Sequence, residues 1–154
     1  MNCVAIYPNN DTGGDIIVNA MDRFRGNRSV RIIPSMRFEY FLTLLKHARA
    51  IVGNSSAGIR EAPVYGVPTV NIGTRQLNRF EHSSIINVAE DAAAVTGALH
   101  NLPNAVVPSR YFGGGESARH FREELSRPQI WKTSRQKHFR DLRHVSPLAQ
   151  PAMM

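Results

Sequence analysis

The sequence predicts an α/β fold in which helices flank a Rossmann-like parallel sheet. Short apolar segments alternate along the chain with longer segments whose apolar residues recur at helical spacing. The connections between the apolar segments are long enough to hold a helix, and parallel strands need crossovers of that length. A length of 154 residues with an apolar fraction of 42% is sufficient for one compact core.

The expected strands are short apolar runs closed by turn residues. They cover residues 3–7, 30–33, 50–52, 67–72 and 85–88. The expected helices cover residues 16–24, 35–48, a short segment after 58, 90–99, 117–125 and 129–142. Ser35 is the expected N-cap of the second helix. The apolar face of this helix is expected to contain Phe38, Phe41, Leu42, Leu45 and Ala48.

Cysteine content and hydropathy limit the class of protein. The single cysteine, Cys3, has no partner for an internal disulfide, and its apolar neighbours predict a buried thiol. No segment reaches the roughly 18 apolar residues of a membrane helix, and no signal-peptide pattern is present. We therefore expect a cytoplasmic protein with no membrane association, no metal site and no cofactor.

The positive charge is concentrated near the C-terminus. Residues 119–143 hold eight Lys or Arg and three Asp or Glu, a balance of +5 out of the total of +7. Nucleic-acid binding by the core is therefore disfavoured. Three interpretations of the basic segment stay open: a solvated face, which is favoured, a polyanion-binding surface, or a contact with an acidic partner domain.

Residues 53–58, Gly-Asn-Ser-Ser-Ala-Gly, follow an expected strand and open a helix. Ligands of open parallel sheets bind outside the carboxyl ends of the strands, where N–H groups at helix starts converge. The hydroxyls of Ser55 and Ser56 and the small side chains around them suit a phosphate group. The same residues are also ordinary at the start of a helix. By themselves they do not distinguish a phosphate-binding loop from a simple helix start.

Glu61 strengthens the binding interpretation. It lies too far along the short helix for the Glu of a capping box, and a carboxylate at this place can accept hydrogen bonds from a ribose diol. Pro63 follows within the same segment, so the helix is expected to be kinked or about two turns long. Arg75, after the next strand, offers a planar donor fork to a phosphate, or is a surface residue. A third loop, Tyr-Pro-Asn-Asn-Asp at 7–11, could supply an amide to a uracil or ribose edge, or simply form a turn.

Two longer strings resemble a known family. Gly-Asn-Ser-Ser-Ala-Gly-Ile-Arg-Glu-Ala-Pro at 53–63 and Gly-Val-Pro-Thr-Val-Asn-Ile-Gly-Thr-Arg-Gln at 66–76 are similar to the UDP-binding signature of hydrolysing UDP-N-acetylglucosamine 2-epimerases. Residues 7–11 and 37–41 resemble flanking family segments. The resemblance extends from about residue 3 to residue 125. It implies the C-terminal half of a two-domain fold of the glycosyltransferase-B type, shared with glycosyltransferases.

The resemblance also implies roles for single residues. Ser55 and Ser56 would bind the diphosphate with the adjoining amides of Ala57 and Gly58, and Glu61 would hold the ribose. Arg75 would make a further nucleotide contact. Asn9 and the backbone around Met36 would lie near the uridine. Residues 1–128 would form the UDP-binding domain, incomplete at its N-terminus, and residues 129–154 a basic helix and tail.

The family reaction, as the resemblance implies it, eliminates UDP from UDP-N-acetylglucosamine to give a glycal. Water is then added with inversion at C2 to release N-acetylmannosamine, a precursor for sialic acid or capsule-type sugars. The catalytic carboxylates would belong to a missing N-terminal domain or a second chain, so this chain alone is expected to bind UDP and to be inactive. Homo-oligomerisation is expected. The alternatives are the donor domain of a glycosyltransferase and a non-enzymatic basic binding module.

Overall fold

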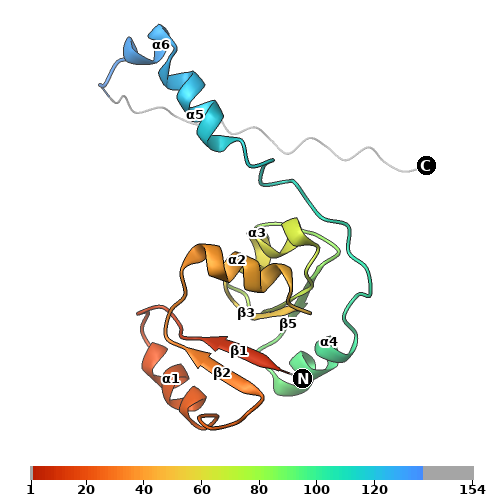
Figure 1. Cartoon of the computed structure of the whole chain (residues 1–154). Helices are drawn as coiled ribbons and strands as arrows, with labels where there is room; N and C mark the ends of the chain where they lie inside the picture. The colour runs from red at the N-terminus through yellow and green to blue at the C-terminus, as the bar shows by residue number, and fades with distance from the viewer. Residues whose placement is uncertain (1, 137–154) are drawn as a thin grey trace, which may run out of the picture. The chain divides into compact units, whose positions relative to one another are not determined.

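The computed structural model describes residues 2–136, and the chain forms two compact units, Met1–Phe112 and Gly113–Met154. The first unit holds all the strands of the described chain, and the second holds two helices (Figure 1). The sequence pattern instead assigned residues 113–128 to the nucleotide-binding domain. Whether residue 128 is a functional boundary stays a prediction.

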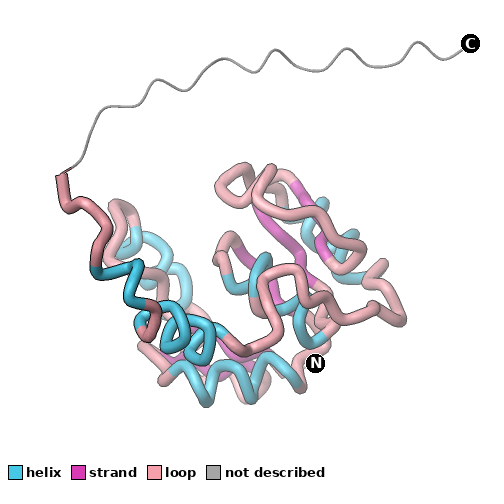
Figure 2. Tube along the Cα trace, turned by 90° about the horizontal axis from the view of Figure 1, so that it is seen from above, coloured by secondary structure: helices cyan, strands magenta, loops and turns pink. Residues whose placement is uncertain are grey.

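The first unit alternates strands and helices along the chain, as the periodicity predicts. Its strands are β1 (Cys3–Ile6), β2 (Val30–Ile33), β3 (Ile51–Gly53), β4 (Thr69–Ile72) and β5 (Ile85–Val88). Its helices are α1 (Gly14–Asp22), α2 (Phe38–Lys46), α3 (Ala57–Arg60), the 3-10 helix η1 (Ala62–Tyr65) and α4 (Ala92–His100). Figure 2 shows how helices and loops surround the strands of this unit.

All strand pairs are parallel, but the strands form two sheets instead of one. β1 pairs with β2, with Cys3 opposite Val30. The second sheet has the order β3-β4-β5, with Ile51 opposite Thr69 and Thr69 opposite Ile85. The crossovers from β1 to β2 and from β3 to β4 contain helices, whereas a long loop over residues 73–84 joins β4 to β5. The carboxyl ends of paired strands therefore lie on one edge of each sheet, where the candidate site residues follow them.

The best-packed part of the unit lies around β4 and the helices that contact its sheet. Leu45, Ala62 and Val67 are buried together and are covered by Phe41 and neighbouring apolar residues. The helical spacing of α2 predicted this face correctly for Phe41, Leu45 and Ala48, which take part in the cluster, but Phe38 is 58% exposed.

The predicted cap of α2 is wrong. Arg37, with extended backbone at φ −60° and ψ 144°, precedes the helix, and no side chain caps it. The helix thus begins later than Ser35. A local capping preference marks a possible start, but the packing of the apolar face decides where the first turn closes.

The prediction that Cys3 is buried is also wrong. Cys3 is exposed, and no residue of β1 reaches full burial. Its apolar neighbours would be covered in a parallel sheet with strands on both sides and helices on both faces. In this chain β1 has a strand on one side only, which leaves part of the strand open to solvent.

The second unit contains α5 (Ser117–Leu125) and α6 (Pro128–Trp131). The helix predicted over 129–142 is wrong within the described residues, because α6 ends at Trp131; residues 137–142, including Phe139, lie outside the described part. Phe121 and Trp131, large apolar residues of this unit, are 66% and 71% exposed.

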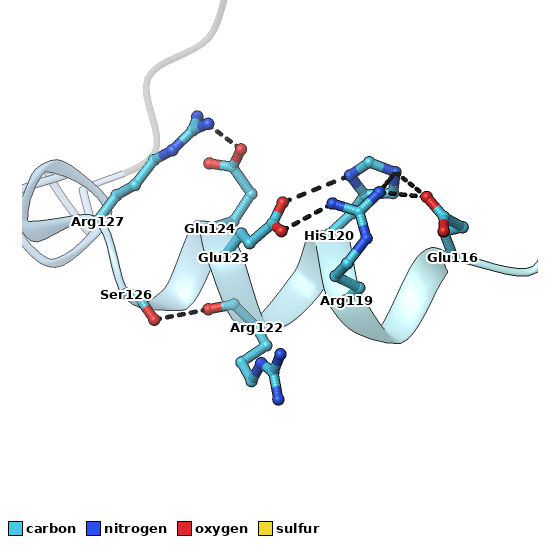
Figure 3. A network of polar contacts seen from close by, with 8 residues as sticks. All are labelled: Glu116, Arg119, His120, Arg122, Glu123, Glu124, Ser126 and Arg127. Atoms are coloured by element: carbon cyan, nitrogen blue, oxygen red, sulfur yellow. Dashed lines mark hydrogen bonds and ion pairs between the residues drawn. The ribbon is translucent and has the colours of Figure 1, made fainter.

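Acidic neighbours pair with the cations of α5 (Figure 3). Arg119 donates hydrogen bonds to Glu116 and Glu123, and these two bonds raise the pKa of its guanidinium. Arg127 contacts Glu124 at 2.6 Å. The described part of the segment therefore carries its charge on a solvated face, where such pairs contribute little to stability. No helix among residues 2–136 is long and apolar enough to cross a membrane.

Candidate functional site

The loop after β3 turns into α3 and leaves its hydroxyls open. Gly53 has φ of 141°, a backbone conformation that side chains disfavour, and the chain then turns through the exposed Ser55 and Ser56 into α3. The Ser55 Oγ accepts a 3.3 Å bond from the N–H of Ala57. Both serine side chains are therefore accessible to a ligand beside the first turn of α3.

Gly58 fixes the distance between α3 and the sheet. A Cβ at this position would lie 2.6 Å from Cγ2 of Thr69, and the Thr69 hydroxyl donates a 2.7 Å hydrogen bond to the carbonyl of Gly58. Both residues are buried, so neither has room to shift. The sequence predicted small residues here for close approach of an anion to the main chain. The structure adds a second reason, the contact between helix and strand.

Glu61 lies at the junction of α3 and η1. The helix α3 ends at Arg60, and the chain continues as a 3-10 helix with Pro63 near its start, which confirms the short, interrupted helix that Pro63 predicted. The Oε2 atom of Glu61 is buried and has no hydrogen-bond partner among the described residues. Buried polar atoms of native proteins are nearly always paired, so an unpaired carboxylate oxygen marks a place where a donor is expected.

Gln76 connects the loop after β4 with the loop after β3, and the sequence pattern did not single it out as a site residue. Its Nε2 donates a 2.9 Å hydrogen bond to the carbonyl of Asn54, and its side chain is only 3% exposed. This bond holds the segment that carries Arg75 beside the serine loop. The signal available in the sequence was a polar side chain directly after Arg75 in the same motif, but its burial depends on tertiary packing.

Arg75 reaches a third loop. Its Nη2 lies 3.8 Å from Oδ2 of Asp11, in the loop after β1, and the two side chains are 54% and 67% exposed. A long and solvated ion pair of this kind contributes little, so the guanidinium can turn to a stronger anion. The loops that follow β1, β3 and β4 therefore converge at the carboxyl edge of the unit.

Asn9 and Met36 lie on the same side of the strands but are not joined to the other site residues. Asn9 is exposed in the loop after β1, and its carbonyl oxygen would lie 2.9 Å from a Cβ at Gly14, so Gly14 permits the tight turn into α1. Met36 is partly buried between β2 and α2. Among the described residues, no hydrogen bond or ion pair links either side chain to Ser55, Glu61 or Arg75.

The edge is therefore an open, polar surface that carries hydroxyl groups and a guanidinium. Serine hydroxyls lie at the start of α3, where the N–H groups of Ala57 and Gly58 donate to Ser55, and the Arg75 guanidinium extends from the loop after β4. The unpaired carboxylate oxygen of Glu61 lies past the end of α3, and no hydrogen bond or ion pair among the described residues joins it to Ser55, Ser56 or Arg75. Within residues 2–136, no group of three or more His, Cys, Asp or Glu side chains is placed to hold a metal ion. The set of groups suits a phosphorylated ligand that also carries a diol.

Comparison with known proteins gives a consistent result. The sequence profile of the UDP-N-acetylglucosamine 2-epimerase family matches residues 1–126. The UDP-N-acetylglucosamine 2-epimerase of Neisseria meningitidis serogroup B is 43% identical over 146 residues, which are 92% of this chain and 38% of that protein. The hydrolysing UDP-N,N'-diacetylbacillosamine 2-epimerase of Legionella pneumophila is 29% identical, over 77% of this chain and 32% of that protein.

A solved structure shows the same fold. The UDP-N-acetylglucosamine 2-epimerase of Methanocaldococcus jannaschii, in complex with UDP-N-acetylglucosamine and UDP, superposes with a TM-score of 0.60 at 23% identity, over 80% of this chain and 34% of that chain. The predicted α/β class, a domain of the glycosyltransferase-B type, is thereby confirmed. The chain spans about a third of the length of these proteins.

Proposed function

Because the chain belongs to the UDP-N-acetylglucosamine 2-epimerase family, we propose that its carboxyl-edge loops bind the UDP part of UDP-N-acetylglucosamine. The unpaired Oε2 of Glu61 carries the proposal, since it supplies an acceptor for a ribose hydroxyl where no donor from residues 2–136 reaches it. Ser55, Ser56 and the N–H groups of Ala57 and Gly58 bind the diphosphate.

The other predicted site residues would contact the remaining parts of the ligand. Arg75 leaves its long contact with Asp11 and binds a phosphate oxygen, because a charge-assisted hydrogen bond to phosphate is stronger than a solvated ion pair at 3.8 Å. Asn9 and the backbone around Met36 lie near the uridine. The Methanocaldococcus jannaschii relative was solved in complex with UDP-N-acetylglucosamine and UDP, which supports this ligand class.

The whole reaction that we propose is hydrolysing 2-epimerisation, which converts UDP-N-acetylglucosamine to UDP and N-acetylmannosamine. The residues of this chain assist the departure of UDP: their N–H groups and the Arg75 guanidinium stabilise the negative charge that develops on the diphosphate as the bond to the sugar breaks. The groups that move protons at C2 come from an N-terminal domain or a second chain. This chain alone is therefore inactive.

The product would enter sialic acid or capsule-type sugar synthesis in the cytoplasm. A relative from Escherichia coli, 35% identical over 63% of this chain and 25% of its own length, is named polysialic acid biosynthesis protein P7, which supports this setting. Association into homo-oligomers is part of the same proposal. The family match favours the epimerase over the alternatives of a glycosyltransferase donor domain and a basic binding module.

Titration of the full chain with UDP, followed by amide shifts in NMR spectra, tests the proposal. We expect shifts at Ser55, Ser56 and Glu61. Arg75→Ala should weaken binding about tenfold or more, the effect of losing one charge-assisted bond, whereas Arg79→Ala, an exposed arginine of the same loop, should not. Unshifted amides at the serine loop of a folded sample, or equal effects of the two variants, would contradict the proposal.

A further inference from the structure

An aromatic cluster lies in the first unit, around the later part of the loop between β4 and β5. Phe80 is its centre, because its ring stacks on Tyr111 with 4.6 Å between centroids and on His82 with 5.7 Å. The ring of Phe112 meets Phe80 edge-on at 5.0 Å, and the guanidinium of Arg60 lies 5.8 Å from the centroid of Phe112. Ring pairs at these separations attract each other beyond the area that they bury, so the cluster is a defined platform.

The segment that carries Phe80 is held at both ends. Before it, the buried Gln76 is bonded to the loop after β3. After it, Nδ1 of His82 lies 2.9 Å from Oγ of the fully buried Ser84. Between these two points Asn78 has φ of 62°, a backbone conformation that is uncommon for residues other than glycine and that occurs often at ligand sites.

A cavity of about 500 Å³ opens beside this segment, and we call it the aromatic pocket. It is lined by Asn78, Arg79, Phe80, Glu81 and Tyr111. One face of the Tyr111 ring stacks on Phe80, and the residue is 72% exposed, so its other face is open to solvent. The volume lies in the range of roughly 300–1,000 Å³ that is typical of sites for small molecules.

The lining combines an aromatic ring face with three polar side chains. Within residues 2–136, no hydrogen bond or ion pair engages the side chain of Asn78, Arg79 or Glu81. A guanidinium donates hydrogen bonds, a carboxylate accepts them and an amide does both. The two charges cancel, so the lining favours a neutral ligand with several donors and acceptors over a phosphate, which the carboxylate would repel.

A sugar ring has this combination of properties. Its hydroxyl groups both donate and accept hydrogen bonds, and the C–H groups on one face of a pyranose form an apolar surface that packs on an aromatic ring. We propose that the aromatic pocket binds a neutral pyranose, with the sugar ring over Tyr111 and its hydroxyls bonded to Arg79 and Glu81. The pyranose is either a free sugar or the sugar part of a nucleotide sugar. The proposal does not depend on the UDP contacts, because none of the residues that line the pocket is among them.

Separate titrations of the full chain with N-acetylglucosamine and with UDP, followed by amide shifts in NMR spectra, test the proposal. We expect N-acetylglucosamine at millimolar concentrations to shift the amides of Asn78, Arg79 and Glu81 and to leave those of Ser55 and Ser56 unchanged. UDP should leave the pocket amides unchanged. The two results are independent, so a failure of the sugar site is distinguishable from a failure of the proposed UDP site.

A third titration, with UDP-N-acetylglucosamine, identifies the source of the sugar. Shifts of the pocket amides together with those of the serine loop would assign the pocket to the sugar part of the nucleotide sugar. Shifts of the pocket amides by free N-acetylglucosamine alone would assign it to a free sugar. Either pattern supports the proposal.

Three variants and a control locate the sugar. Tyr111→Ala should weaken binding of N-acetylglucosamine about tenfold, because the ring on which the sugar packs is lost, whereas Tyr111→Phe keeps the ring and most of the affinity. Glu81→Gln should weaken binding several-fold, since a hydrogen bond to a charged acceptor becomes one to a neutral acceptor. Tyr40→Ala removes an aromatic side chain that is 63% exposed in α2, outside the pocket, and should leave sugar binding unchanged.

Three results would overturn the proposal. The first is a folded sample in which N-acetylglucosamine shifts none of the pocket amides. The second is a shift of these amides by UDP but not by the sugar, which would make a nucleobase the occupant. The third is an equal effect of Tyr111→Ala and Tyr40→Ala on sugar binding.

Discussion

Replacement of Glu61 by Gln separates ligand binding from folding. The substitution keeps the size of the side chain and exchanges one carboxylate oxygen for an amide group. Oε2 is buried and has no hydrogen-bond partner in the described part of the chain, so folding removes the hydration of this oxygen without supplying a hydrogen bond from those residues. We expect Glu61→Gln to leave the free energy of unfolding unchanged or to raise it, while UDP binding becomes weaker.

The size of the loss follows from the bond that is removed. A hydrogen bond to a charged acceptor contributes about 1.5–3 kcal/mol, which is roughly 10- to 150-fold in Kd. Gln keeps one acceptor oxygen, so the loss should lie near the lower end, about tenfold. The opposite signs of the two effects distinguish a ligand-binding carboxylate from one that only supports the fold.

Calorimetric titration with UDP and chemical unfolding of the full chain measure the two effects. Glu39→Gln is the matched control, because Glu39 is an exposed carboxylate whose 3.4 Å contact with Arg37 lies on the surface. A titration with a UDP analogue that lacks both ribose hydroxyls completes a double-mutant cycle. With that analogue, wild type and Glu61→Gln should bind equally.

Two outcomes would refute the reasoning about Glu61. The first is an equal loss of affinity for UDP and for the analogue without ribose hydroxyls, since the carboxylate would then act on another part of the ligand. The second is a large loss of stability in the unliganded variant, which would show that Oε2 has a partner within the protein.

Two further predictions concern the framework of the site. Gly58→Ala should lower the free energy of unfolding by about 1–3 kcal/mol, because the new Cβ would lie 2.6 Å from the buried Thr69. Gly97→Ala is the control in α4, where nothing lies within 4 Å of the new Cβ, and it should raise the free energy of unfolding by about 0.5–1 kcal/mol. Chemical unfolding measures both changes. Gln76→Ala removes the hydrogen bond to Asn54, so it should lower the free energy of unfolding by about 1 kcal/mol and weaken UDP binding several-fold in the calorimetric titration. A destabilised variant that binds UDP as tightly as the wild type would show that this bond does not position the loop after β3.

The chemistry of the site was largely predictable from the sequence, but its geometry was not. Ser55, Ser56 and Arg75 follow strands that hydrophobic pattern alone identifies, and parallel pairing places the ends of neighbouring strands on one edge. The roles assigned to these residues stay predictions. Gln76 was missed because its part depends on burial and on a hydrogen bond to a loop 22 positions earlier, and residue type does not encode either.

Glu61 lies between these two cases. Its distance from the start of α3 indicated that it has no capping role, and in the structure the hydroxyl of Ser55, not the carboxylate of Glu61, accepts the N–H of Ala57 at the start of that helix. The sequence could not indicate that one of its oxygens is buried without a partner. The interruption at Pro63 was predictable, but the burial of this oxygen depends on how the residues around η1 pack, which the surrounding fold sets.

The sequence by itself determined the succession of strands and helices and the parallel pairing of the strands, because periodicity, turn residues and crossover length act over a few residues. The tertiary structure alone decided how the strands are divided between two sheets and which apolar side chains are covered. Cys3 and Val4 have the composition of a buried strand, yet they are exposed because burial depends on neighbours that are distant in sequence.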